Sequence, residues 1–141
     1  MEEKELTPEE IQAQELAEAA QAKEDAFWEA TNAKASSIAS ATGKRVVPIV
    51  IQDIDTPGEY VVGYMYRPDL DTQLKLSDKG QEFASGFSYL AGSAVLESLL
   101  IKAESDKRIN TETDQGELYW KGAIIALFEF VKGARAVIKK K

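Results

Sequence analysis

The sequence predicts an α+β fold in which a long N-terminal helix precedes one β-hairpin and three further helices. Between Pro8 and Gly43 no glycine or proline interrupts the chain, which favours one long helix. Residues 46–67 alternate apolar and other side chains on both sides of a turn, a pattern typical of a hairpin. After that hairpin the apolar residues recur at helical spacing. We predict strands at about 46–54 and 59–67, and helices at about 69–79, 82–101 and 114–139.

Length and composition indicate a folded chain without covalent or metal staples. The 141 residues are enough to bury a real core. Cysteine and histidine are both absent, which excludes disulfides, thiolate chemistry, zinc sites built on these ligands and catalysis with an imidazole base. No secretory signal and no apolar run long enough to cross a membrane is visible. We therefore expect a soluble intracellular protein with no membrane partner.

The negative charge is concentrated at the N-terminus. The net charge is −7, and residues 1–33 hold ten acidic side chains but only two lysines. The rest of the chain is nearly balanced. We therefore predict two parts, an acidic helical arm at 1–42 and a single α+β domain at 43–141. An acidic arm repels phosphate, so we expect no nucleic-acid partner.

The arm carries helix signals at both ends. Thr7 can cap the helix, Pro8 suits its first position and Gly43 follows its end. Apolar residues are sparse in it, which favours a solvated arm. The alternative interpretation is that Phe27 and Trp28 anchor the arm to another protein or to a second subunit.

The predicted hairpin has an aliphatic and an aromatic side. Val47, Ile49 and Ile51 share one face of the first strand. Pro48 lies among the residues of the opposite face, and its missing N–H favours a strand at the edge of a sheet. The second strand alternates Tyr60, Tyr64 and Tyr66 with other residues, and cross-strand packing or partner binding would use these rings. Two strands alone are marginal, so they must pack on helices, pair with another chain, or both.

Capping signals and apolar stripes predict the remaining helices. Asp69 or Asp71 can cap a short helix that ends near Gly80. Asp114 and Glu117 resemble a capping box before the last helix. That helix carries a continuous apolar stripe, which makes it the central core helix or part of an oligomer interface. The stripe consists of Trp120, Ile124, Leu127, Val131, Ala134 and Ile138.

Aspartate pairs are the only motifs that resemble catalytic or metal sites. Asp53 and Asp55 follow a strand, as in aspartate-nucleophile phosphatases, but the threonine comes one position early and the chain is too small for that fold. An EF-hand loop starting at Asp53 would need ligands where Pro57 and Tyr64 stand. Glycines form no phosphate-binding pattern. We therefore expect no enzyme activity, no cofactor and no metal, and keep a carboxylate enzyme only as a remote alternative.

Residues 46–141 resemble the tail assembly chaperones of tailed phages and prophages. The resemblance rests on the hairpin leading into residues 64–68 (YMYRP), residues 95–101 (VLESLLI), residues 104–109 (ESDKRI) and a last helix that closes on lysines. The long acidic helix before Gly43 departs from the compact start of that family, which leaves room for a role as a virion component.

The resemblance implies a non-catalytic phage protein that binds other proteins. Its partner would be a tape-measure-like helical protein, shielded from aggregation during tail assembly in the host cytoplasm. The alternative is a structural virion protein that assembles into oligomers. Partner contacts would come from Phe27 and Trp28 in the arm and from Pro48 and the three hairpin tyrosines, Tyr60, Tyr64 and Tyr66. The hairpin edge and the wide apolar last helix also favour self-association.

Overall fold

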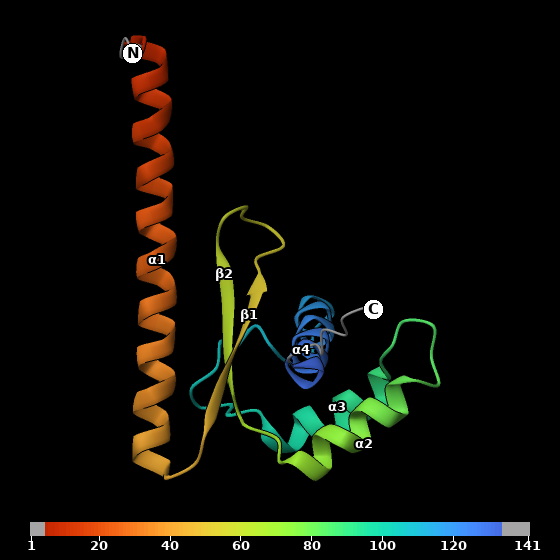
Figure 1. The fold of residues 1–141 in the computed structure, drawn as a ribbon. Coiled ribbons are helices and arrows are strands. Elements are labelled where there is room, and N and C mark those ends of the chain that lie inside the picture. Colours follow the sequence, from red (N-terminus) through yellow and green to blue (C-terminus); the bar gives the residue numbers. More distant parts are fainter. Residues whose placement is uncertain (1–4, 134–141) are drawn as a thin grey trace, which may run out of the picture. The chain divides into compact units, whose positions relative to one another are not determined.

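A computed structural model describes residues 5–133 of the chain (Figure 1). Its secondary structure confirms the predicted α+β class and the predicted order of elements. They are α1 (Pro8–Thr42), β1 (Val46–Gln52), β2 (Tyr60–Tyr66), α2 (Leu70–Gly80), α3 (Tyr89–Leu99) and α4 (Asp114–Lys132). The predicted continuation of the last helix to residue 139 and its terminal lysines lie outside the described residues.

Helix α1 begins and ends where the sequence predicts. The Thr7 hydroxyl accepts a hydrogen bond from the Glu10 N–H at 3.1 Å, which satisfies one of the unpaired donors of the first turn. Gly43 follows the helix with φ of +70°, a left-handed conformation that costs glycine little. The helix therefore has a capping residue at its start and a glycine stop at its end.

The contacts of the chain divide it into two compact units, residues 1–34 and residues 35–141. This division falls inside α1, whereas the sequence places the boundary between residues 42 and 43. The last turns of α1 belong to the second unit because Ala35 and Ile38 are buried together with Tyr64 in a small apolar cluster. Half-buried Val46 and Val62 pack against the same cluster.

The hairpin separates two apolar clusters because its side chains alternate between its two faces. β1 and β2 are antiparallel, with Ile49 opposite Gly63 and Pro48 opposite Tyr64. Odd-numbered residues such as Ile49 and Met65 face the main core. Even-numbered residues, Tyr64 among them, face the last turns of α1. Asp53 to Glu59 form the connecting turn, in which Gly58 has a φ of +84°.

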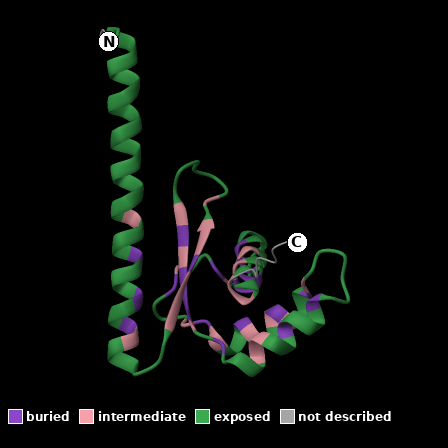
Figure 2. Cartoon of the chain, viewed as in Figure 1, coloured by how far each residue is buried: buried purple, intermediate pink, exposed green. Residues whose placement is uncertain are grey.

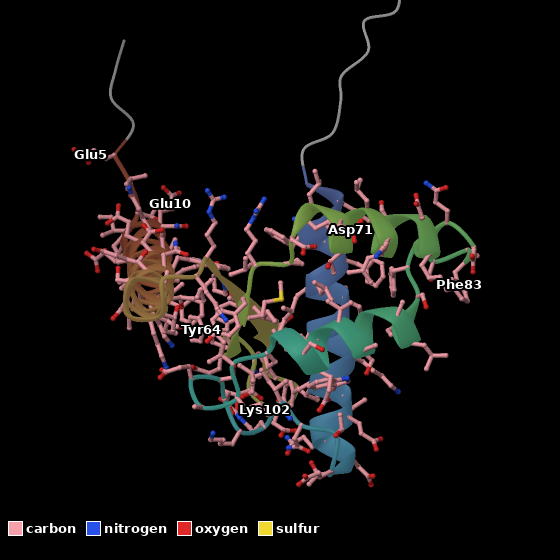
Figure 3. All side chains as sticks on the ribbon, turned by 90° about the horizontal axis from the view of Figure 1, so that it is seen from below. Glu5, Glu10, Tyr64, Asp71, Phe83 and Lys102 are labelled. Atoms are coloured by element: carbon pink, nitrogen blue, oxygen red, sulfur yellow. The ribbon has the colours of Figure 1, made fainter. Side chains whose placement is uncertain are left out.

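The main core lies between the hairpin and the last three helices. In the view of Figure 3, α2 and α3 both cross α4, and Figure 2 shows that all three helices contain buried residues. Gly92 lets α3 approach α4 closely, because a methyl group there would meet the side chains of Ile124 and Phe128. The buried residues of this cluster are Ile49, Val61, Met65, Leu76, Leu96, Leu100, Ile109, Tyr119, Trp120, Ala123, Ile124, Leu127 and Phe128.

One helix start and one capping residue differ from their predictions, whereas α4 begins at Asp114 as predicted. α3 begins at Tyr89 rather than near residue 82, because Gly86 adopts a φ of +79° and the Ser88 side chain caps the helix. α4 is capped by Thr113 rather than by Asp114, since the Thr113 hydroxyl accepts the Gly116 N–H at 2.9 Å. At the other end of α4, the helix stops at Lys132 because Gly133 has a φ of +56°.

The last turns of α1 contain buried side chains, whereas its first turns are exposed. We therefore predict that shortening an apolar side chain destabilises the fold in the last turns but not in the first. Ile38→Ala should lower the free energy of unfolding by about 2–5 kcal/mol, because it leaves a cavity beside Tyr64. Leu16→Ala on the same helix is the control and should change it by less than about 0.5 kcal/mol, because Leu16 is exposed. Urea unfolding of both variants measures the difference, and equal losses would contradict the assignment of Ile38 to the core.

Candidate protein-binding surfaces

The segment that follows α3 closes the outer edge of β2. Ile101 donates its N–H to the Tyr64 carbonyl at 2.8 Å, and Asp106 donates its N–H to the Val62 carbonyl at 2.9 Å. Met65 and Leu100 form an isolated bridge just before these contacts. The segment therefore acts as a short, irregular third strand. The carbonyls of Val62 and Tyr64 on this side of the hairpin are thus occupied within the chain.

Ser105 supplies the hydrogen bond that the irregular segment cannot make with its own backbone. Its hydroxyl accepts the Tyr64 N–H at 2.9 Å and lies 2.7 Å from the Ile101 carbonyl, to which it donates. The Ser105 side chain is buried. Burial, and then the nearby charge of Glu104, raises the pKa of the Tyr64 phenol. Ser105 therefore keeps a buried β2 N–H paired.

Arg108 joins the hairpin turn to the same segment through two carboxylates. Its Nη1 lies 2.8 Å from Asp53 Oδ2, and its Nη2 lies 2.9 Å from Asp106 Oδ2. The Tyr119 hydroxyl of α4 donates to Asp53 Oδ1 at 3.3 Å and accepts the Ile54 N–H at 3.2 Å. We call Asp53, Asp106, Arg108 and Tyr119 the turn clasp. The clasp fixes the hairpin turn against α4.

The aspartates of the clasp are held in their charged form. The Asp55 N–H hydrogen bond lowers the pKa of Asp53, and the Arg108 guanidinium lowers it further. The Arg108 side chain is the main cause of the lowered pKa of Asp106. Both carboxylates in turn raise the pKa of Arg108. A carboxylate with a lowered pKa is a weak base, so this geometry suits an ionic staple better than proton transfer.

The second aspartate pair of the sequence is a helix cap. The Asp69 carboxylate accepts the Thr72 N–H at 2.8 Å, which confirms one of the two capping residues predicted for α2. Hydrogen bonds from the Thr72 side chain and backbone lower the pKa of Asp69. Asp71 forms an exposed ion pair with Lys75 at 2.8 Å on the helix surface.

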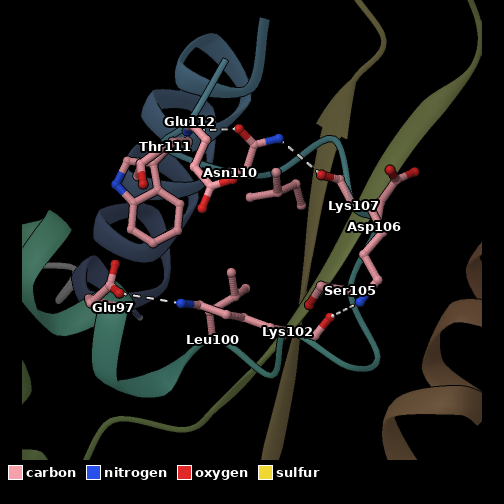
Figure 4. A pocket seen from close by; sticks show the side chains of 11 residues that line it. Glu97, Leu100, Lys102, Ser105, Asp106, Lys107, Asn110, Thr111 and Glu112 are labelled. Atoms are coloured by element: carbon pink, nitrogen blue, oxygen red, sulfur yellow. Dashed lines mark hydrogen bonds and ion pairs between the residues drawn. The ribbon is translucent and has the colours of Figure 1, made fainter. Parts of the chain in front are cut away.

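A shallow pocket of about 260 Å³ lies beside the segment that closes β2 (Figure 4). The polar side chains that line the pocket form ion pairs and hydrogen bonds within its lining. Lys102 Nζ lies 3.3 Å from Glu97 Oε1, and Lys107 Nζ donates to the Lys102 carbonyl at 2.9 Å. Asn110 donates to the Lys107 carbonyl at 3.0 Å. These contacts therefore hold the loop between α3 and α4 in its conformation.

The four predicted binding residues of the hairpin lie on one face but differ in exposure. Pro48 and Tyr64 are cross-strand partners, and Tyr60 and Tyr66 lie at the two ends of β2. Tyr64 is only 4% exposed, so it belongs to the core rather than to an exposed surface. Pro48, Tyr60 and Tyr66 are half-buried. Lys44 Nζ lies 4.8 Å from the centre of the Tyr66 ring, a cation–π contact within the chain.

The two predicted binding residues of the arm are adjacent in α1. Phe27 is half-buried, and Trp28 is 39% exposed. Their rings pack edge to face, with centroids 5.4 Å apart. Before them, every residue from 5 to 26 is exposed, as Figure 2 shows along the first turns of α1. Ile11 and Leu16 are the exposed apolar side chains of this stretch of the helix.

Exposed apolar residues of the helical part were missed by the sequence analysis. Leu118 and Ile125 lie on α4 at 51% and 38% exposure, and Leu90 on α3 is 87% exposed. Helical periodicity does not show which apolar residues outside the main stripe are exposed. The exposure of these side chains depends on how far the neighbouring elements extend over them, and a local sequence pattern does not contain that information. Within residues 35–133, the other large exposed apolar residues are Ile54, Leu70, Leu74, Phe83 and Tyr89.

Comparison with protein-family models, with curated proteins and with solved structures found no match to this chain. Among residues 5–133, no group of three or more acidic side chains is placed to hold a metal ion. Within the same range, no helix combines the length and the apolar character needed to cross a membrane.

Loss of the Ser105 hydroxyl should destabilise the chain, because it leaves the buried Tyr64 N–H without a partner. We expect Ser105→Ala to reduce the free energy of unfolding by about 1–3 kcal/mol. Ser98→Ala is the matched control, because Ser98 is an exposed serine of α3 and its substitution should change little. Urea unfolding followed by circular dichroism compares the two. A loss for Ser98→Ala as large as that for Ser105→Ala would argue against this role.

Acid should weaken the turn clasp. The pKa values of Asp53 and Asp106 are lower in the folded chain than in the unfolded chain. Their stabilising effect is therefore complete above about pH 4 and is lost as the pH falls through the folded-state values. Asp53→Asn should lower the urea midpoint at pH 7 and flatten its decrease on acidification. The exposed Asp78→Asn control should follow the wild type, and parallel curves for all three chains would contradict the prediction.

Proposed function

We propose that this chain is a non-catalytic, chaperone-like binding protein that acts in the tail or virion assembly of a tailed phage. Its partner is another phage protein, a helical tape-measure-like protein in the leading version, bound in the host cytoplasm. The proposal joins the resemblance of residues 46–141 to tail assembly chaperones with the surfaces described above. The single observation that carries it is the exposed first part of α1.

The first part of α1 is a helix without a covering layer of its own. Residues 5–26 are exposed throughout, although most helices in proteins are stabilised by packing one face against other elements. Ile11 and Leu16 point apolar side chains into solvent at 44% and 65% exposure. Capping by Thr7 and the acidic first turn help the helix to form. Such a helix is suited to packing against another helical protein.

The negative charge of α1 indicates what kind of protein surface the partner presents. Residues 5–26 carry seven acidic side chains and one lysine, so they favour a surface rich in lysine and arginine. The same charge disfavours nucleic acid. The partner surface we propose is therefore a basic helix with apolar residues that cover Ile11 and Leu16.

The acidic residues that could have suggested catalysis have other roles in this fold. Asp53 and Asp106 are bound to Arg108, and Asp69 caps α2. Buried side-chain nitrogen and oxygen atoms within residues 5–133 all have hydrogen-bond partners. These observations support a binding role over the remote alternative of a carboxylate enzyme.

Co-expression with a long, helical tape-measure-like tail protein of the phage that encodes this chain tests the proposal. The wild type should co-purify with it at low salt and less well at high salt, because opposite charges attract. A double variant, Ile11→Ser with Leu16→Ser, should bind roughly tenfold more weakly or worse, since 1.4 kcal/mol corresponds to one factor of ten. The matched control is Ile54→Ser, which changes an equally exposed apolar residue of the hairpin turn.

Absence of the tail protein from the wild-type eluate at low salt would contradict the proposal, as would equal binding by the double variant. Mass spectrometry of purified particles distinguishes the two forms of the hypothesis. A chaperone leaves before maturation, so the chain should be absent from particles. Its presence in a fixed ratio to other tail proteins would instead identify a structural virion protein.

A further inference from the structure

The outer edge of β1 has unpaired backbone groups. Asp53 donates to the Glu59 carbonyl and Arg67 donates to the Arg45 carbonyl, so the odd-numbered residues of β1 direct their N–H and C=O groups toward β2. The even-numbered residues direct theirs away from it. Within the described part of the chain, nothing hydrogen-bonds to the backbone of Val46, Val50 or Gln52 on this side. β1 is therefore an open edge, whereas the edge of β2 is closed.

Pro48 lies at one of these outward positions. It breaks no hydrogen bond of the hairpin there, and its carbonyl still points outward as an acceptor. An unpaired edge is a template for a further strand. The edge thus offers donors at Val46, Val50 and Gln52, and acceptors that include the Pro48 carbonyl.

An apolar face of α4 lies next to the open edge. Gly122 packs so closely on Ile51 of β1 that a methyl group on it would lie 2.9 Å from Ile51 Cγ2. Leu118 and Ile125 stand one turn before and after Gly122 on the same side of the helix and are 51% and 38% exposed. If a further strand paired with β1, the side chains or helix that cover one face of that strand would pack against Leu118 and Ile125. Edge and helix face together form one docking surface.

The charges at the two ends of β1 are self-complementary. Lys44 and Arg45 precede the strand and the exposed Asp55 follows it, whereas the charge of Asp53 is already paired with Arg108. A second β1 in antiparallel orientation would place the basic end of each copy beside the acidic end of the other. A parallel orientation would place like charges together, which is unfavourable. The sequence of the edge therefore selects a second copy of the same strand.

We propose that two copies of this chain pair through β1, antiparallel about Ile49, to give one continuous four-stranded sheet. In that register Val46 of each copy lies opposite Gln52 of the other, and Val50 donates to the Pro48 carbonyl. Arg45 lies opposite Asp53, which Arg108 of the same chain already pairs, and within diagonal reach of the exposed Asp55. The Leu118 and Ile125 faces of the two α4 helices lie on the same side of the joined sheet. This inference does not depend on the proposed function.

Sedimentation of the full-length chain at micromolar concentration tests the pairing. The wild type should sediment as a dimer of 15.5 kDa chains. Val50→Pro removes an outward N–H without removing a hairpin hydrogen bond, and should weaken the dimer roughly tenfold or more, the equivalent of about 1.4 kcal/mol. Val50→Ala is the matched control, because it shortens the same side chain and keeps the N–H. It should remain dimeric.

A charge-reversal cycle gives a second test that does not alter the strand backbone. Arg45→Asp and Asp55→Lys should each weaken the dimer, because like charges then meet at both ends of the paired strands. The double variant restores opposite charges between positions 45 and 55 and should recover dimerisation, since the charge of Asp53 is paired with Arg108 in every variant. Circular dichroism of each variant verifies that the fold is kept.

Three results would overturn the pairing. They are a wild type that stays monomeric throughout the micromolar range, a dimer unaffected by Val50→Pro, and a double charge variant as weak as the single ones. The pairing would also be overturned if the wild type were a monomer bound to another protein and Val50→Pro abolished that binding. The edge of β1 would then pair with an extended segment of the other protein.

Discussion

The closure of β2 by the segment after α3 is the constraint on which the second unit depends. A hairpin of two strands is marginal by itself, because half of its backbone groups face outward unpaired. Ile101 and Asp106 supply N–H donors to the β2 carbonyls, and the Ser105 hydroxyl fills the position between them. The same segment leads to Ile109, whose side chain packs against Gly63 of β2 and belongs to the main core.

The turn clasp extends that closure to the far end of the hairpin. Arg108 lies two residues after Asp106, so the chain that pairs with β2 also delivers the cation that holds Asp53. Tyr119 adds a hydrogen bond from α4, which ties turn, loop and helix together at one point. Asp53 of the turn therefore has a structural role, and the Asp55 carboxylate accepts a hydrogen bond from the Gln115 side chain of α4 at 2.9 Å. The asymmetry that results, one closed edge and one open edge, makes β1 the edge available to another strand.

The protein-binding interpretation combines two kinds of surface. The exposed part of α1 offers acid and a few apolar side chains over many turns, a surface whose affinity depends on charge. The edge of β1 offers directional backbone hydrogen bonds beside an apolar helix face. The two surfaces lie in different units of the chain. Self-association through the edge would therefore present two acidic helices to a partner, with a gain in avidity.

Local chemistry determined the class and order of elements in this protein. Caps such as Thr7 and Asp69, the glycine stop at Gly43, and the alternation around the 55–58 turn depend on neighbours only a few residues away, so the sequence displays them directly. Tertiary structure alone decided that Tyr64 is buried, that Ser105 and Arg108 close the hairpin, and that Leu118 stays exposed. Those outcomes join residues tens of positions apart, and no periodicity or spacing in the chain encodes which distant groups meet.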